Sequence, residues 1–131
     1  MNTQLSFAKQ EHLCSKKLID SLFGGGGRSM VAFPLRVVYM KVPLTEQSAP
    51  LAEMMVSVSK HHFKRAVKRN RVKRQVREAY RNNKSILLKA LASKGNERII
   101  MAFVWQEPKI RTSADVEEKM INLLHRIVER L

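Results

Sequence analysis

One segment sets the strongest constraint on what this chain can fold into. Residues 60–84 contain eleven lysines and arginines but a single acid, Glu78, so they hold +10 of the chain's net charge of +14. A solvated helix face normally mixes both signs, because like charges one turn apart repel each other. Such a one-sided segment predicts a surface for a polyanion, either a nucleic acid or an anionic membrane.

The apolar residues of this segment fall into two phases. On a helical wheel the first set lies on one side and the second set nearly opposite, so one straight helix cannot bury both. The first set is Phe63, Ala66 and Val67, and the second is Val72, Val76, Ala79 and Tyr80. We therefore expect a turn or short helix over residues 61–67, followed by the main helix over residues 68–82.

The main helix carries a polar stripe opposite its apolar stripe. The polar stripe follows the spacing i, i+4, i+7, i+11 and consists of Asn70, Arg74, Arg77 and Arg81, with Lys73 and Lys84 flanking it. Glu78 is predicted to pair locally with Arg74, Arg81 or Asn82. This helix therefore has two partners, a protein core and a polyanion.

The sequence before the basic segment predicts one helix and two or three strands. Residues 15–23 have helical spacing, with Ser15 as N-cap and four glycines to end the helix. Residues 29–42 read as two strands, or as one strand kinked at Pro34. In the second half of this stretch the side chains alternate between two faces. One face has Leu35, Val37, Tyr39 and Lys41, and the other has Arg36, Val38, Met40 and Val42.

Two further strands and a last helix complete the pattern. Residues 54–59 alternate as a strand, and residues 98–105 are almost continuously apolar, which predicts a central strand. A final helix is capped by Thr112 or Ser113. The expected fold is an α+β sandwich, in which helices pack on one sheet of about four strands.

The sequence shows no set of residues for catalysis or metal binding. A protein nuclease usually holds magnesium with clustered carboxylates, but the two aspartates here, Asp20 and Asp115, lie near opposite ends. The single cysteine, Cys14, excludes an internal disulfide and a cysteine-based zinc site. Adjacent His61 and His62 match no metal-ligand spacing. We therefore expect no catalytic residue and no metal ligand in the protein.

Length and composition predict one cytoplasmic domain. A chain of 131 residues that is 44% hydrophobic can bury its own core. Its longest apolar run, residues 99–105, is too short to span a bilayer. Residues 1–10 contain no long apolar stretch, so no secretory signal is expected, and a lone thiol fits a reducing cytosol.

Residues 56–84 strongly resemble the signature region of the bacterial ribonuclease P protein component. The resemblance is carried by Arg69-Asn70-Arg71, then Lys73-Arg74 and Arg77, directly after a strand that ends in Ser-Val-Ser-Lys. The helix and glycines near the start fit as well, and so does the strand–helix order at the end. The resemblance covers nearly the whole chain, so residues 1–131 are interpreted as one domain of this family, with residues 1–10 flexible.

The resemblance implies a fold and a function. The implied order is α-β-β-β-α-β-α, with a left-handed β-α-β crossover where the general rule favours a right-handed one. The implied role is that of the protein subunit of a ribonucleoprotein endonuclease that removes the 5′ leader from precursor tRNA. In that enzyme the RNA subunit chiefly holds the catalytic magnesium ions. The implied partners are the catalytic RNA and precursor tRNA, without DNA or membrane, and the protein alone is expected to be inactive.

The resemblance also implies which residues meet RNA. The signature helix faces the catalytic RNA, and the lysines and arginines that flank the signature in the sequence extend this surface. Together with Arg81 of the polar stripe, the residues expected to contact RNA are Lys60, Lys64, Arg65, Lys68, Arg69, Asn70, Arg71, Lys73, Arg74, Arg77 and Arg81.

A second implied site is a groove between the first helix and the sheet, which binds the leader. Phe23, Val37 and Tyr39 match its positions, and an aromatic ring there can stack on a single-stranded base. The alternative for these residues is an ordinary place in the core. One turn before Phe23 the family often has an aromatic residue, where this chain has Ile19.

Composition alone leaves three other interpretations. A ribosomal protein or RNA chaperone fits the charge equally well, and the signature residues are what separate it from a ribonuclease P protein. A helix-based DNA-binding protein would need a helix-turn-helix pair, which is not recognisable here. A membrane-surface helix would need the apolar stripe that the core already uses.

Overall fold

A computed structural model describes residues 9–44 and 49–131 of the chain. Most of the N-terminal stretch expected to be flexible lies outside the described residues. The elements in chain order are a 3₁₀ turn (Lys9–Glu11), α1 (Lys16–Ser21), a π-turn (Leu22–Gly26), β1 (Arg28–Ala32), β2 (Leu35–Pro43), β3 (Ala52–Val58), α2 (Ala66–Asn83), α3 (Ser85–Lys94), β4 (Glu97–Trp105) and α4 (Ser113–Glu129).

The four strands form one sheet in the order β1-β2-β4-β3. β1 and β2 are two separate antiparallel strands that flank Pro34, which decides between the two alternatives for residues 29–42. β4 lies between antiparallel β2 and parallel β3, so the prediction of a central apolar strand is confirmed. The parallel pair is joined through α2 and α3, which make the expected β-α-β crossover.

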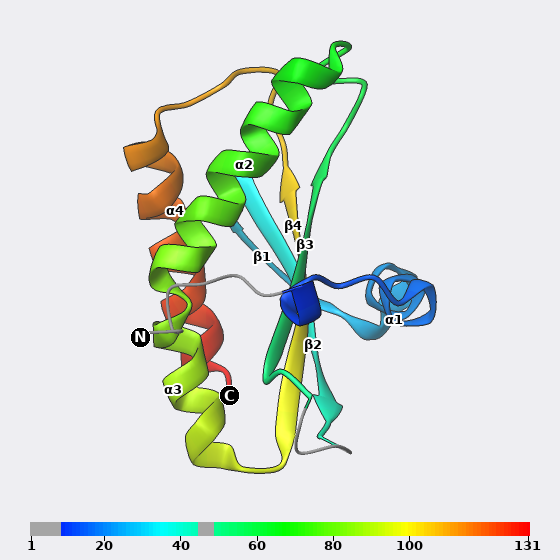
Figure 1. Ribbon diagram of the computed structural model, residues 1–131, viewed down its shortest axis with the longest axis vertical. Helices are drawn as coiled ribbons and strands as arrows, with labels where there is room; N and C mark the ends of the chain where they lie inside the picture. The colour runs from blue at the N-terminus through cyan, green and yellow to red at the C-terminus, as the bar shows by residue number, and fades with distance from the viewer. Residues whose placement is uncertain (1–8, 45–48) are drawn as a thin grey trace.

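The sheet has a helical layer on each face (Figure 1). Helices α2, α3 and α4 cover one face, where Leu35, Val37 and Tyr39 enter the larger core. Helix α1 lies on the other face, where Val38 is buried and Met40 is partly buried in a smaller core. The alternation predicted for β2 is therefore confirmed, and it directs the buried residues of this strand into one of two cores.

Hydrogen bonds at the helix ends explain where the helices begin and stop. The Ser15 hydroxyl accepts from the Leu18 amide at 3.3 Å, as predicted for an N-cap. The Thr112 hydroxyl accepts from the Asp115 amide at 3.2 Å, so Thr112 rather than Ser113 caps α4. Gly95 ends α3 with a φ of 84°, a left-handed conformation that glycine adopts without strain.

Helix α3 is an element that the sequence interpretation missed. It follows α2 after a single residue, Lys84, and buries Leu87 and Leu91. These leucines lie one turn apart, which is a helical spacing, so the sequence does contain a signal for this helix. The described residues therefore contain two helices where one was expected between β3 and β4.

The phase change in the basic segment is confirmed for Phe63, whereas Ala66 and Val67 of the same predicted set are exposed residues of α2. Phe63 is buried in the turn that precedes α2, whereas Val72 and Val76 are buried by the helix itself. The helix begins at Ala66, two residues earlier than predicted. Val67 in its first turn is 79% exposed, so it belongs to neither core.

Candidate nucleic-acid interface

Helix α2 presents the polar stripe on the side away from the sheet. Asn70, Arg74 and Arg77 are exposed and Arg81 is half-buried, and together with Glu78 they line one shallow surface recess of ≈ 340 Å³. The opposite side of the helix is buried in the larger core. The prediction of one helix with an apolar and a basic face is therefore confirmed, and the recess is open to a large polyanion.

Glu78 selects one of its three predicted partners. The Arg81 guanidinium donates to the Glu78 carboxylate through Nε at 3.2 Å and again through Nη2. This hydrogen bond lowers the pKa of Glu78 and raises the pKa of Arg81. Arg81 is thus neutralised locally, and Arg74 and Arg77 carry the stronger positive field of the stripe.

The lysines and arginines at the N-terminal end of α2 extend the surface of the polar stripe, with one exception. Five of the predicted RNA contacts are exposed there: Lys60, Lys64, Arg65, Lys68 and Arg71. Arg69 is half-buried, and its Nη1 donates to the carbonyl oxygens of Phe63 and Lys64, both at 2.8 Å. Arg69 therefore ties the turn before α2 to the helix, a role that the sequence pattern did not indicate.

Lys84 was placed beside the polar stripe by its spacing, and this placement is wrong. Its side chain is 3% exposed, and Nζ lies 2.7 Å from Oε1 of Glu11. Glu11 comes from the 3₁₀ turn near the N-terminus, so the ion pair ties this turn to the junction of α2 and α3. The helical spacing alone cannot reveal it, because the partner lies 73 residues away in the chain.

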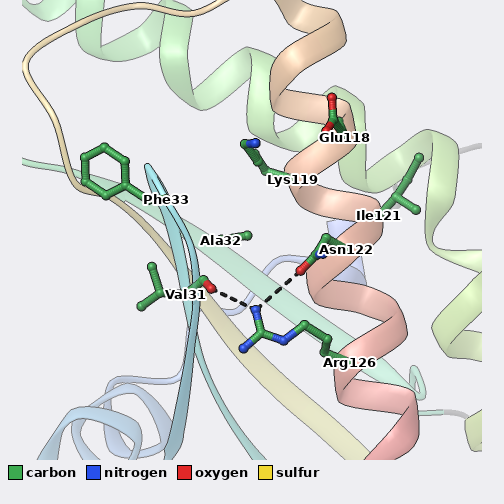
Figure 2. A pocket seen from close by; sticks show the side chains of 8 residues that line it. All are labelled: Val31, Ala32, Phe33, Glu118, Lys119, Ile121, Asn122 and Arg126. Carbon is green, nitrogen blue, oxygen red and sulfur yellow. Dashed lines mark hydrogen bonds between the residues drawn. The ribbon is translucent and has the colours of Figure 1, made fainter.

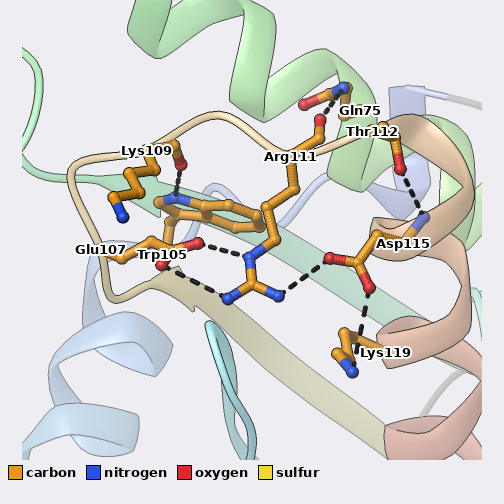
Figure 3. A network of polar contacts seen from close by, with 8 residues as sticks. All are labelled: Gln75, Trp105, Glu107, Lys109, Arg111, Thr112, Asp115 and Lys119. Carbon is orange, nitrogen blue, oxygen red and sulfur yellow. Dashed lines mark hydrogen bonds and ion pairs between the residues drawn. The ribbon is translucent and has the colours of Figure 1, made fainter.

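A polar network holds the middle of α2 in place (Figure 3). Gln75 of α2 donates to the Arg111 carbonyl oxygen at 2.8 Å. The Arg111 guanidinium in turn binds the carboxylates of Glu107 and Asp115, which raise its pKa. The Trp105 indole donates to the Lys109 carbonyl at 3.0 Å and closes the loop. The loop between β4 and α4 is therefore tied to the middle of the basic helix by hydrogen bonds.

The structure corrects the residues assigned to the groove beside the first helix. Phe23 is 52% exposed, which is compatible with a binding position. Val37 and Tyr39 are buried in the larger core, on the sheet face that α1 does not cover. Placing them in a groove next to α1 is therefore wrong, because the period-2 alternation of β2 turns them toward α4.

Different residues of the sheet lie on the face that α1 covers. Val31, Arg36 and Val104 lie directly opposite one another on β1, β2 and β4, so they form one row across the α1 face of the sheet. Val31 is exposed and the other two are half-buried. The sequence contained the signal, since Arg36 falls on the same face as Val38 and Met40, but the resemblance was carried over to the wrong face.

Within residues 9–44 and 49–131, no three histidine, cysteine or acidic side chains gather closely enough to hold a metal ion. The rings of His61 and His62 lie 5.8 Å apart at a tilt of 56°. No helix in these residues has the length and apolar character that crossing a bilayer requires.

Comparison with known proteins identifies the family. The family model for ribonuclease P matches residues 7–128. This chain belongs to the ribonuclease P protein family. It is 51% identical over 80 residues to the ribonuclease P protein component of Porphyromonas gingivalis, a match that covers 61% of this chain and 56% of that protein. It is 34% identical over 118 residues to that of Chlorobaculum tepidum, covering 83% of this chain and 77% of the relative.

Solved structures of this family have the same fold. The RNase P protein of Staphylococcus aureus superposes with a TM-score of 0.67 at 18% identity, covering 89% of this chain and 94% of that one. The protein from Thermotoga maritima gives a TM-score of 0.67 at 21% identity, covering 88% and 96%. The signature residues thus lie on a ribonuclease P protein fold, although the chain spans about 56% of the length of the P. gingivalis relatives.

Arg74→Ala and Arg77→Ala should each weaken the salt dependence of RNA binding. Each phosphate that an arginine or lysine neutralises releases condensed counterions. Losing one such phosphate contact should therefore flatten the slope of log affinity against log salt by about 0.7–0.9. The melting temperature should hardly change, because both side chains are exposed. Affinity titrations at several salt concentrations, with melting curves, test this; lower stability with an unchanged slope would show that the stripe is structural.

Proposed function

We propose that this chain is the protein subunit of ribonuclease P and takes part in removing the 5′ leader from precursor tRNA. The observation that carries this proposal is the exposed basic face of α2, which bears the signature residues on the family's fold. Arg74 and Arg77 lie in one open recess with Asn70. Arginine forks bind phosphates in pairs of hydrogen bonds, and RNA of this kind is recognised by phosphate and shape more than by base edges.

In this proposal the RNA subunit does the chemistry. Hydrolysis of a phosphodiester with magnesium needs oxygen ligands that hold the ions beside the scissile phosphate. The family implies that the RNA subunit supplies them, and the protein raises the affinity for substrate and for magnesium. This work would take place in the cytoplasm, with the catalytic RNA and precursor tRNA as partners.

The two faces of the protein divide the work. The basic face of α2 docks on the RNA subunit, while the α1 face of the sheet receives the leader. On that face the row of Val31, Arg36 and Val104 offers apolar surface beside a guanidinium, and Phe23 adds an exposed ring. A single strand binds such surfaces by stacking and by phosphate contacts.

Reconstitution tests the proposed function. Adding the protein to a bacterial ribonuclease P RNA should lower the magnesium concentration needed for leader cleavage. The lysines and arginines of the protein replace part of the ionic screening that folded RNA requires. The protein alone should leave precursor tRNA intact. The measurement is the cleavage rate against magnesium concentration, with and without protein. Metal-dependent cleavage by the RNA-free protein, or no effect on the RNA, would contradict the proposal.

A further inference from the structure

The sheet edge farthest from β3 carries a second concentration of positive charge. β1 is an edge strand, and α4 runs alongside it (Figure 1). A recess of ≈ 240 Å³ at one end of this seam is lined by Arg28 of β1, Lys41 of β2 and Arg130 at the end of α4. All three side chains are exposed, and the described residues that line the recess include no carboxylate.

The strand register explains why these bases converge. Arg28 lies directly opposite Tyr39, and Lys41 lies two residues farther along β2. The side chains of Arg28 and Lys41 therefore both point to the sheet face that α4 covers. The C-terminal end of α4 favours a cation, which accounts for Arg130 but not for two more from the strands. The Glu97 carboxylate reaches Lys41 only at 4.0 Å. Three like charges around one recess repel each other unless an anion lies between them.

A larger hollow of ≈ 510 Å³ continues the seam toward the other end of β1 (Figure 2). Its helix side is lined by Glu118, Lys119, Ile121, Asn122 and Arg126. Arg126 donates to the carbonyl oxygen of Val31 at 2.8 Å and to Oδ1 of Asn122 at 3.3 Å, which fixes the guanidinium between strand and helix. On the strand side Phe33 is 54% exposed, and the Arg111 guanidinium lies 5.9 Å from its ring centroid. An exposed aromatic ring therefore stands at the edge of a hollow that contains Lys119, Arg126 and one acid, Glu118.

We propose that this seam binds a single strand of RNA, with a backbone phosphate in the recess of Arg28, Lys41 and Arg130 and a base stacked on Phe33. Guanidinium groups bind phosphates through paired hydrogen bonds, and exposed rings stack on bases of any sequence. From Arg28 to Phe33 the strand extends roughly 16 Å at about 3.3 Å per residue, the reach of a few nucleotides. The choice of RNA among phosphate polymers rests on the proposed function.

The test must separate this surface from α2. Binding of a fluorescent single-stranded RNA of about eight nucleotides is therefore measured in the full chain carrying Arg74→Ala and Arg77→Ala. Adding Arg28→Ala and Arg130→Ala should weaken binding about tenfold or more and flatten the salt slope by roughly one to two units. Lys89→Ala with Lys94→Ala removes the same charge from exposed positions on α3 and should change neither quantity.

Two further variants distinguish charge from stacking. Arg28→Lys with Arg130→Lys should restore the salt slope, because the phosphate charge is again neutralised. Phe33→Ala should weaken binding about 5–100-fold with the slope unchanged, because stacking releases no counterions. Equal losses from the seam pair and the α3 pair, or no loss from either, overturn the proposal. The assay contains no RNA subunit or leader, so its failure is distinct from a failure of the reconstitution.

Discussion

Tyr39→Ala should lower the free energy of unfolding by about 3–5 kcal/mol, because it empties a large site in the core. The ring is 3% exposed and packs in the larger core with Val37. The affinities of the variant enzyme for precursor tRNA and for mature tRNA should fall together, in proportion to the unfolded fraction of the protein. Chemical denaturation and the two affinities of the reconstituted enzyme provide the measurements.

Phe23→Ala is the matched variant on the other side of the sheet. Its side chain is 52% exposed, so stability should hardly change. If the ring stacks on a leader base, binding of precursor tRNA should weaken by up to ~1–3 kcal/mol while binding of mature tRNA is kept. The opposite pattern, with selective loss of precursor binding in Tyr39→Ala, would return Tyr39 to the leader site and contradict its place in the core.

Removing only the hydroxyl of Tyr39 separates packing from polarity. Within the described residues the Tyr39 hydroxyl is buried and has no hydrogen-bond partner. A buried polar group without a partner costs stability, so Tyr39→Phe should keep or raise the free energy of unfolding. A loss in this variant as large as in Tyr39→Ala would show that the hydroxyl, rather than the ring, holds the site together.

Much of the fold follows from local rules in the sequence. The caps at Ser15 and Thr112 mark helix starts, because their hydroxyl oxygens accept hydrogen bonds from the backbone amides three residues later. The period-2 alternation of β2 correctly separated Val37 from Val38, and the phase change after Phe63 correctly divided a turn from a helix. These features depend on neighbours within a few residues, so one sequence suffices to predict them.

The features that were missed depend on side-chain partners and packing that residue spacing does not show. Lys84 has the spacing of a stripe residue, but its ion pair with Glu11 keeps it buried and away from the polar stripe. Arg69 belongs to the signature, but its guanidinium serves carbonyl oxygens of the preceding turn. The groove residues were misplaced because the sequence does not say which sheet face α1 covers. The three-dimensional arrangement decides all of these, and spacing alone cannot.

Lys84→Ala should lower the free energy of unfolding by about 3–5 kcal/mol, although the lysines of the adjacent α2 are exposed or half-buried. Lys84 is 3% exposed and lies 2.7 Å from Glu11, whose side chain is 13% exposed. Removing one member of a buried ion pair leaves the other charge in a site of low polarity, which costs far more than the pair itself contributes. Denaturation curves measured on the full chain give the difference.

Two controls make this prediction specific to the buried pair. Lys84→Met combined with Glu11→Gln removes both charges and should recover most of the lost stability. Arg81→Ala breaks the ion pair with Glu78 at the surface and should hardly change the free energy of unfolding. Because Lys84 faces the core rather than the stripe, the double variant should bind the RNA subunit as tightly as the wild type. A tenfold loss of RNA affinity in that stable variant would place Lys84 on the RNA surface and contradict the structural role.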